Sequence, residues 1–265
     1  AGQFGPDMKP EKIRPAFQAL GFEDVIEVAV GADLCTIEEA KDFMKEVPEE
    51  LPFMATSCCP AWSMMAKKLF PEQAKCISMA LTPMVLTARL IKQQNPDCKI
   101  VFVGPCAAKK LEASRKTIRS YVDFVLTFEE LQGMFDAKGV DFKELPDGEP
   151  LMQASADGRG FAASGGVASA VVNAIRRMEP NREVKVVSAE GLANCKKMLQ
   201  LAKAGKYNGY LLEGMACPGG CIAGAGTIQP IKKTAASLEQ MKKQAPFEES
   251  MDTVYDAMLP ILEKL

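Results

Sequence analysis

The sequence predicts an α/β fold built from mostly parallel, twisted sheets with helices on their faces. Short apolar runs typical of buried strands alternate with longer segments whose apolar residues recur at helical spacing. The chain has 265 residues, of which 48% are hydrophobic and 25% are charged, so it is long enough for one large domain or two lobes.

Six apolar runs are expected to form strands because they are short and are bounded by polar, glycine or proline residues. In chain order they cover residues 24–30, 51–56, 99–104, 123–127, 183–189 and 207–214. Helical spacing is found over residues 9–20, 36–47, 60–69, 80–94, 108–119, 128–136, 166–178, 190–204 and 234–264. Strands separated by such helices pair in parallel through right-handed crossovers. Residues 135–160, rich in charge, glycine and proline, are expected to connect two lobes or to loop over the surface.

Composition excludes several classes of function. The chain has no histidine, which excludes Ser-His and Cys-His catalysis and imidazole-bound metals. A net charge of −2 without a basic block argues against nucleic acid as the main partner. No apolar run approaches the roughly 20 residues that span a bilayer, and no secretory leader is visible, so we expect a cytoplasmic protein without membrane contact. In that reducing compartment the nine cysteines are expected to be thiols or metal ligands.

Cysteines follow three of the predicted strands. The segments are TSCCPAW (56–62), GPCAAKK (104–110) and EGMACPGGCIAGAG (213–226). Because ligands collect beyond the carboxyl ends of parallel strands, we expect these three loops to meet in one crevice.

The third segment is the richest in glycine. Glycines around Cys217 and Cys221 allow close backbone approach and leave N–H groups free to face an anion such as an iron–sulfur cluster. Taken alone, the segment could equally be a glycine-rich turn with two buried thiols. Zinc is disfavoured because only one short C-x₂₋₄-C unit is present.

The other two segments complete a possible ligand set. Cys59, Cys106, Cys217 and Cys221 would supply the four thiolates that a [4Fe–4S] cluster needs. Cys58 would then stand beside the cluster without a ligand role, with a thiol able to exchange protons. Without that context, Lys109 and Lys110 would be ordinary surface lysines and the cysteine pair would belong to a core. The remaining cysteines are interpreted as structural thiols: Cys35, Cys76, Cys98 and Cys195.

Together the three segments resemble the active-site signatures of the [FeFe]-hydrogenase family. TSCCPAW is similar to TSCCPxW, GPCAAKKLE to M-P-C-x-x-K-x-x-E, and EGMACPGGC to E-x-M-x-C-x-x-G-C. The resemblance extends from about residue 31 to about residue 226. It implies a single catalytic domain, residues 1–265, of two lobes that hold the H-cluster in the cleft between them, without the family's N-terminal ferredoxin-like domains.

The H-cluster is a [4Fe–4S] cubane joined through one cysteine to a diiron unit with CO, CN⁻ and an azadithiolate bridge. The resemblance makes Cys221 the shared sulfur and Cys58 the proton donor. Lys109 would bond a cyanide with Glu112 as its partner at i+3, and Met215 and Phe161 would line the diiron pocket. It also implies a proton relay through Glu39, Ser78 and Asp42, although the same three residues could simply be solvated.

The chain departs from the family pattern at several positions. Gly104 stands where the motif has methionine, Met84 replaces a glutamine, and Asp42 replaces an outer glutamate. These departures suggest a less-studied subgroup.

The implied activity is reversible turnover, 2H⁺ + 2e⁻ ⇌ H₂, with electrons from ferredoxin or an accessory iron–sulfur domain and with maturation proteins inserting the diiron unit. An H₂-sensing relative with the same cluster is a variant of this hypothesis. A non-catalytic protein similar to cluster-assembly factors, with a [4Fe–4S] cluster alone, is the competing hypothesis. A zinc or disulfide structural domain is a third.

Overall fold

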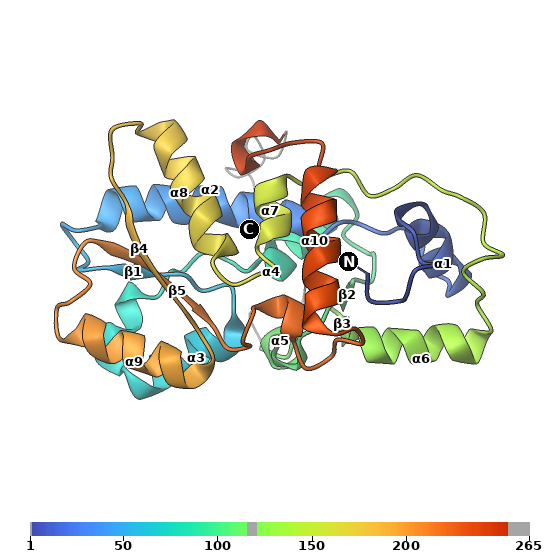
Figure 1. The fold of residues 1–265 in the computed structure, drawn as a ribbon, viewed down its shortest axis with the longest axis horizontal. Coiled ribbons are helices and arrows are strands. Elements are labelled where there is room, and N and C mark those ends of the chain that lie inside the picture. The colour runs from blue at the N-terminus through green and yellow to red at the C-terminus, as the bar shows by residue number, and fades with distance from the viewer. Residues whose placement is uncertain (1, 116–120, 254–265) are drawn as a thin grey trace.

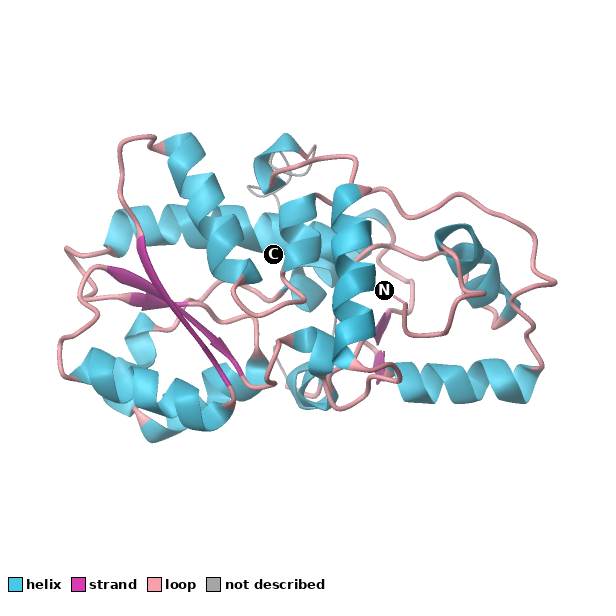
Figure 2. Ribbon diagram, viewed as in Figure 1, coloured by secondary structure: helices cyan, strands magenta, loops and turns pink. Residues whose placement is uncertain are grey.

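The computed structural model describes residues 2–115 and 121–253, and it contains two parallel sheets with helices around them (Figures 1 and 2). The first sheet has the order β1 (Met54–Ala55), β5 (Tyr210–Met215), β4 (Lys185–Glu190). The second pairs β2 (Val101–Val103) with β3 (Phe124–Leu126). The predicted α/β class with parallel sheets is confirmed.

The three-stranded sheet lies between two pairs of helices. On one side are α2 (Ala29–Glu46) and α8 (Gly166–Met178), and on the other are α3 (Pro60–Leu69) and α9 (Leu192–Lys203) (Figure 2). Phe43, Ile175, Trp62 and Leu199 from these four helices belong to one buried cluster with Leu211 of β5. This three-layer arrangement buries the central strand β5, in which residues 211–215 are all buried, while the edge strand β4 stays largely exposed.

The smaller sheet is packed by α4 (Pro83–Gln94) and α5 (Ala107–Ala113). Beside it lie α1 (Ile13–Ala19) and α6 (Phe128–Lys138), which share a cluster of aromatic side chains around Phe135. The remaining helices are α7 (Ala156–Gly160) and α10 (Ile231–Lys243), with short 3₁₀ turns at Pro10–Lys12, Pro71–Cys76, Cys221–Ala223 and Ser250–Asp252. Residues 139–153 run without helix or strand from α6 back to α7 (Figure 1).

The prediction of a strand over residues 24–30 is wrong. Residues 22–28 have no regular structure, and Ala29 and Val30 begin α2, seven residues before the expected start at residue 36. The reason is tertiary. The N–H of Glu27 donates to Gln153 Oε1 (3.0 Å), and its carboxylate pairs with Arg159, so this segment has no strand neighbour.

The predicted tail helix over 234–264 is confirmed over residues 234–243 and is wrong beyond them in the part that is described. α10 begins at Ile231 and ends at Lys243, three residues before Pro246, which disfavours helix in the residue before it. Phe247 then forms a parallel bridge with Ser155. The rest of that prediction, and the last residues of the helix predicted over 108–119, lie outside the described residues.

The only tryptophan joins the first sheet to the cysteine pair. Trp62 is fully buried, and its Nε1–H donates to the carbonyl of Thr56 (2.9 Å). A Cβ added to Gly214 of β5 would lie 2.2 Å from the ring, so only glycine lets the strand approach this closely. The contact fixes the TSCCPAW turn against the end of β5.

None of the helices in the described ranges is long and apolar enough to cross a membrane.

Candidate functional site

Three loops bring five cysteines to the wall of one cavity of about 440 Å³. Cys58 and Cys59 follow β1, Cys106 follows β2, and Cys217 and Cys221 follow β5. The carboxyl ends of strands from both sheets therefore open into the same space, as expected for parallel α/β folds. The predicted convergence of the three segments is seen in the structure.

Two of these cysteines begin helices. Cys59 is the N-cap residue of α3, with Pro60 at the first helical position, and Cys106 is the N-cap residue of α5. The amino end of a helix favours negative charge, and the N–H of Ala216 donates to Cys59 Sγ (3.5 Å). Cys59 Sγ therefore faces the cavity with one backbone N–H donor beside it.

Glycines bring the loop after β5 against two other loops. A Cβ on Gly224 would lie 2.4 Å from the carbonyl oxygen of Pro105, next to Cys106, and the N–H of Gly226 donates to that oxygen (2.9 Å). Gly220 has a φ of +89°, and its Cβ would lie 2.6 Å from the backbone nitrogen of Ser164. The position of Cys221 between these contacts thus requires small residues on both sides of it.

The donor set fits a multinuclear cluster better than a single ion. Across the described residues, no group of three or more His, Cys, Asp or Glu side chains has the geometry to hold one metal ion. All nine cysteines are free thiols, and the other four do not line the cavity. In a [4Fe–4S] cluster each cysteine binds a different iron, so ligands that surround a cavity without meeting at one point suit such a cluster.

The thiols influence one another. Burial raises the pKa of Cys221 to about 12, and the nearby Cys59, Cys106 and Cys217 add to the rise. Burial is also the main cause that raises the pKa of Cys58, followed by the negative charge of Glu39. In the metal-free protein both thiols hold their protons, and a metal bound to Cys221 would displace the proton of that ligand.

Lys109 lies inside the protein and Lys110 does not. The Lys109 side chain is buried, with Nζ 2.7 Å from Glu112 Oε2 and 3.4 Å from the carbonyl oxygen of Cys58. Glu112 is held in turn by the Thr82 hydroxyl, which donates to Oε1 (2.8 Å). Lys110 is exposed and pairs with Glu130. One buried cation therefore reaches the cavity wall beside the cysteine pair.

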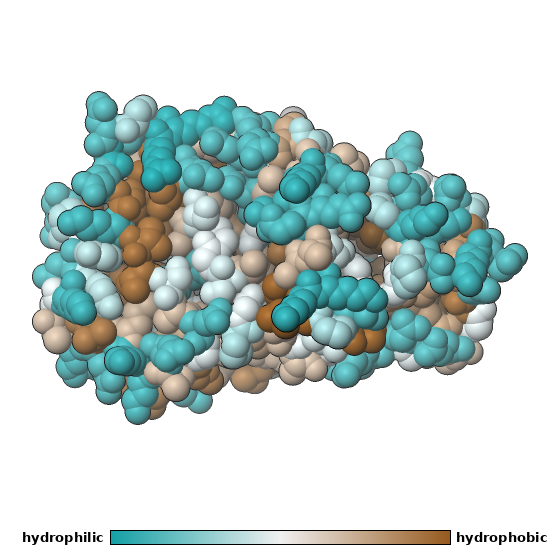
Figure 3. Space-filling view, in the orientation of Figure 1, coloured by the Kyte–Doolittle hydropathy of each residue, from teal (hydrophilic) through white to brown (hydrophobic). Residues whose placement is uncertain are grey.

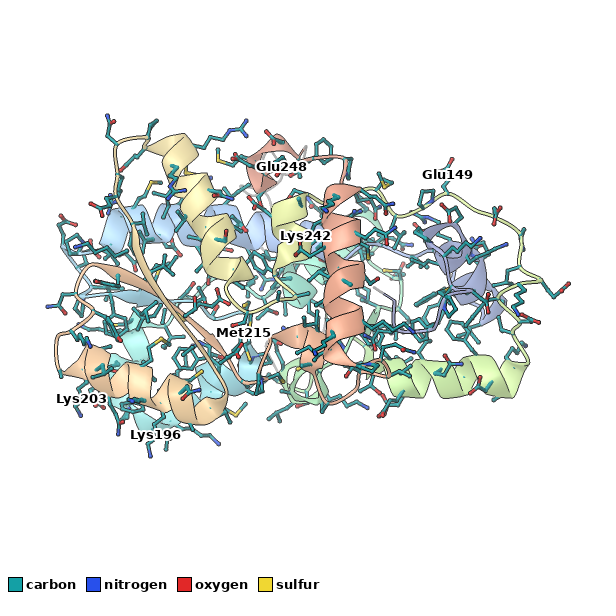
Figure 4. All side chains as sticks on the ribbon, viewed as in Figure 1. Glu149, Lys196, Lys203, Met215, Lys242 and Glu248 are labelled. Carbon is teal, nitrogen blue, oxygen red and sulfur yellow. The ribbon has the colours of Figure 1, made fainter. Side chains whose placement is uncertain are left out.

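Met215 and Phe161 also line the cavity. Met215 ends β5 near the middle of the molecule (Figure 4), and Phe161 directly follows α7. Both side chains are buried. They form part of the apolar wall of the cavity, and their role beside a diiron unit stays a prediction.

Glu39 lies in the interior behind Cys58. It is fully buried on α2, and its Oε1 accepts the Ser57 N–H (3.2 Å). Burial raises its pKa to about 7, although the hydrogen bonds from the Ser57 N–H and the Ser78 hydroxyl act to lower it. Ser78 is buried beside it, while Asp42, one turn further along α2, is partly exposed. The residues thus run from the cavity toward the surface, and their use as a proton path stays a prediction.

Sequence reasoning missed part of the cavity wall. Phe102, Gln3 and Arg159 line it. Arg159 is buried, with Nε 2.7 Å from Glu27 Oε1, and Gln3 is held by Thr234 through a 2.9 Å hydrogen bond. The one available signal was the place of Arg159 within GRGF, two residues before Phe161.

Residues 1–225 match the family described as the iron only hydrogenase large subunit, C-terminal domain. Iron hydrogenase 1 of Clostridium pasteurianum is 30% identical over 89% of this chain, which spans 50% of that protein's length. A probable cytosolic Fe-S cluster assembly factor of Aedes aegypti is 27% identical over 96% of the chain and 66% of its own length. The chain thus spans about half to two thirds of these relatives.

Solved structures share the fold. An [FeFe]-hydrogenase from Chlamydomonas reinhardtii superposes with a TM-score of 0.78 at 22% identity, covering 94% of this chain and 83% of that one. At this level of identity the likeness concerns the fold alone.

The buried Glu39 carboxyl predicts a pH dependence of stability in the metal-free protein. Its pKa of about 7 in the folded state exceeds the ordinary value of 4.5, so the folded state holds the extra proton between these values. The free energy of unfolding should therefore fall as pH rises through this window.

In Glu39→Gln, the loss of stability between pH 5 and pH 8 should shrink by about 2 kcal/mol, measured by urea denaturation. The matched control is Glu129→Gln at an exposed position on α6. An unchanged pH dependence in Glu39→Gln would contradict the burial argument.

Proposed function

Because the chain belongs to the family of iron-only hydrogenase large subunits, we propose that it is a hydrogenase that interconverts protons, electrons and H₂. Family membership implies an iron–sulfur cluster, and the finer assignment of residues to it is our proposal. The observation that carries the proposal is that five thiols and one buried lysine border a single cavity.

Four residues would hold the [4Fe–4S] cubane: Cys59, Cys106, Cys217 and Cys221. Four thiolates around such a core carry a net charge of about −2, which is costly to bury without cations and N–H donors. Lys109 supplies the cation, and the Ala216 N–H supplies one donor. By resemblance Cys221 is the sulfur shared with the diiron unit.

The diiron unit would lie beside Cys58, Lys109, Met215 and Phe161. When bound, it supplies the iron site at which protons and electrons combine. Lys109, positioned by Glu112, would orient a cyanide, and the two apolar side chains would exclude water.

Protons would move through Cys58 and the residues behind it. The thiol pKa of Cys58 is raised, so it holds its proton, and Glu39 has a pKa of about 7, which suits exchange in both directions near neutral pH. Ser78 and Asp42 would continue the path outward.

A non-catalytic iron–sulfur protein is the second candidate. It is supported by the Aedes aegypti relative named as a cluster assembly factor, which matches nearly the whole chain. Such a protein needs the four cubane cysteines only. The presence of Cys58, Lys109 and Met215 at the cavity favours the hydrogenase, or an H₂ sensor with the same cluster.

An infrared spectrum of the protein, taken after exposure to hydrogenase maturation proteins, tests the choice. The hydrogenase proposal expects intrinsic CO and CN⁻ bands. Four irons per chain with no such bands would support the second candidate instead.

Replacing Cys58 should separate proton delivery from cluster binding. Cys58→Ala is expected to keep its iron content and infrared bands but to lose H₂ turnover by about 100-fold or more, the usual range for a lost general acid. Cys98→Ala, a thiol outside the cavity, is the control. Turnover equal to that of the control would remove Cys58 from the proton path.

We propose ferredoxin, or another acidic iron–sulfur carrier or domain, as the electron partner. α3 packs against α5 and α9, and neither α3 nor α9 contains Asp or Glu. Their exposed basic residues, which we call the basic face, are Lys67, Lys68, Lys196, Lys197 and Lys203, with Arg115 just after α5. Hydrophilic side chains, with apolar ones between them, lie along the lower left edge of the molecule, where Lys196 and Lys203 point outward (Figures 3 and 4).

The basic face lies close to the proposed cubane. α3 and α5 start at Cys59 and Cys106 and lead outward from the cavity. Burial lowers the pKa of Lys67, and the positive charge of the nearby Arg115 adds to the effect, so these two cations lie close together. Lys203 already pairs with Glu72, but on a chain with a net charge of −2 the gathering of the other cations on one face suits an acidic partner.

Charge reversal tests this surface. Lys67→Glu/Lys68→Glu is expected to raise the KM for ferredoxin about 10-fold at low salt, with less effect at high salt and none on turnover with a small dye. Lys138→Glu, at the exposed end of α6, is the control. Equal KM values in both variants would contradict docking at the basic face.

A further inference from the structure

Gly104 and Phe102 are in contact inside the cavity wall. Both residues line the cavity near Cys106. They are two residues apart on β2 and its extension, where the N–H of Gly104 still pairs with the carbonyl of Leu126 (3.0 Å), so they share one face of the strand. The ring of Phe102 turns toward the glycine.

The contact leaves no room for a side chain at position 104. A Cβ built there would lie 2.6 Å from Cζ and 2.7 Å from Cε1 of Phe102. Carbon atoms in ordinary contact are about 3.5–4.0 Å apart, so the ring would have to move by about 1 Å. Gly104 is not among the glycines with positive φ, so the backbone alone does not demand glycine. A side chain at position 104 would therefore displace the Phe102 ring without straining the backbone.

The ring has one open side. Away from Gly104, Phe102 packs against a buried cluster that includes Met84, Val85 and Val122. Such a core is close-packed, so the Phe102 ring cannot move far into it. The cavity is the remaining free space, so a side chain at position 104 would push the ring into it.

We propose that Phe102 and Gly104 act as one pair that sets the free space beside Cys106, and thereby the access of small apolar molecules to the site. The ring occupies the place that a side chain at position 104 would take, so the missing methionine of the family motif does not simply open the cavity. The pair acts as a positioning and access element and takes no part in proton transfer.

Xenon binding to the metal-free protein tests the pair directly, because apolar cavities take up xenon. Phe102→Ala is expected to raise xenon occupancy of the cavity at least two-fold at a fixed pressure. Gly104→Ala is expected to lower it by at least half, and the double variant should behave like Phe102→Ala. Phe124→Ala, on the neighbouring strand at an exposed position, is the matched control.

Occupancy in Phe102→Ala and Gly104→Ala equal to that of the control would overturn the proposal. If Gly104→Ala fails to fold, Phe102→Leu replaces it, since the smaller side chain creates no clash and should still raise occupancy. Xenon occupancy in Phe102→Leu that is no higher than in the control would then overturn the proposal.

A second readout rests on the proposed function. In the matured protein, CO should bind faster in Phe102→Ala and slower in Gly104→Ala, each by about three-fold or more. Altered xenon occupancy together with absent CO and CN⁻ infrared bands would overturn the hydrogenase proposal but keep the pair. Unchanged xenon occupancy in the metal-free variants, together with CO and CN⁻ bands in the matured protein, would overturn the role of the pair but keep the hydrogenase proposal.

Discussion

The contact between the loop after β5 and the loop after β2 is the constraint on which the site depends. Gly224 and Gly226 meet the carbonyl of Pro105 so closely that a Cβ on Gly224 would overlap it. This contact joins the three-stranded sheet to the two-stranded one where their cysteines emerge. Because Cys106 follows Pro105 and Cys221 precedes Gly224, the spacing of thiols from the two sheets is set by backbone packing.

Buried charge is the second requirement of the same cavity. The described interior near the cysteine pair holds the carboxyl groups of Glu39, Glu112 and Glu213, and the buried cation Lys109 pairs with one of them. Glu112 is neutralised by Lys109, and the Glu213 carboxylate accepts the N–H groups of Gly165 and Ala168 (2.7 and 2.8 Å) at the start of α8. Burial raises the pKa of Glu39 to about 7, because the Ser57 N–H and the Ser78 hydroxyl offset only part of the cost of burying its charge.

Much of the fold and the site could be predicted from the sequence, because these elements are determined by local sequence patterns. Five strands were found from apolar runs, and the meeting of the cysteine loops followed from their places after strands. The strand predicted over residues 24–30 is wrong because a tertiary contact determines the structure of this segment: Glu27 pairs with Arg159, which is far away in the sequence. Phe102 was missed for a similar reason: its importance comes from a contact with Gly104 that only the folded chain reveals.

The position of Trp62 provides the molecule with its own optical reporter. It is the only indole in the chain, lies three residues after Cys59 and is shielded from solvent, so all tryptophan emission comes from one point beside the cavity. An iron–sulfur centre absorbs light at the wavelengths that tryptophan emits. Loading of the cavity can therefore be followed as quenching of this fluorescence, without a label and without any assay of turnover.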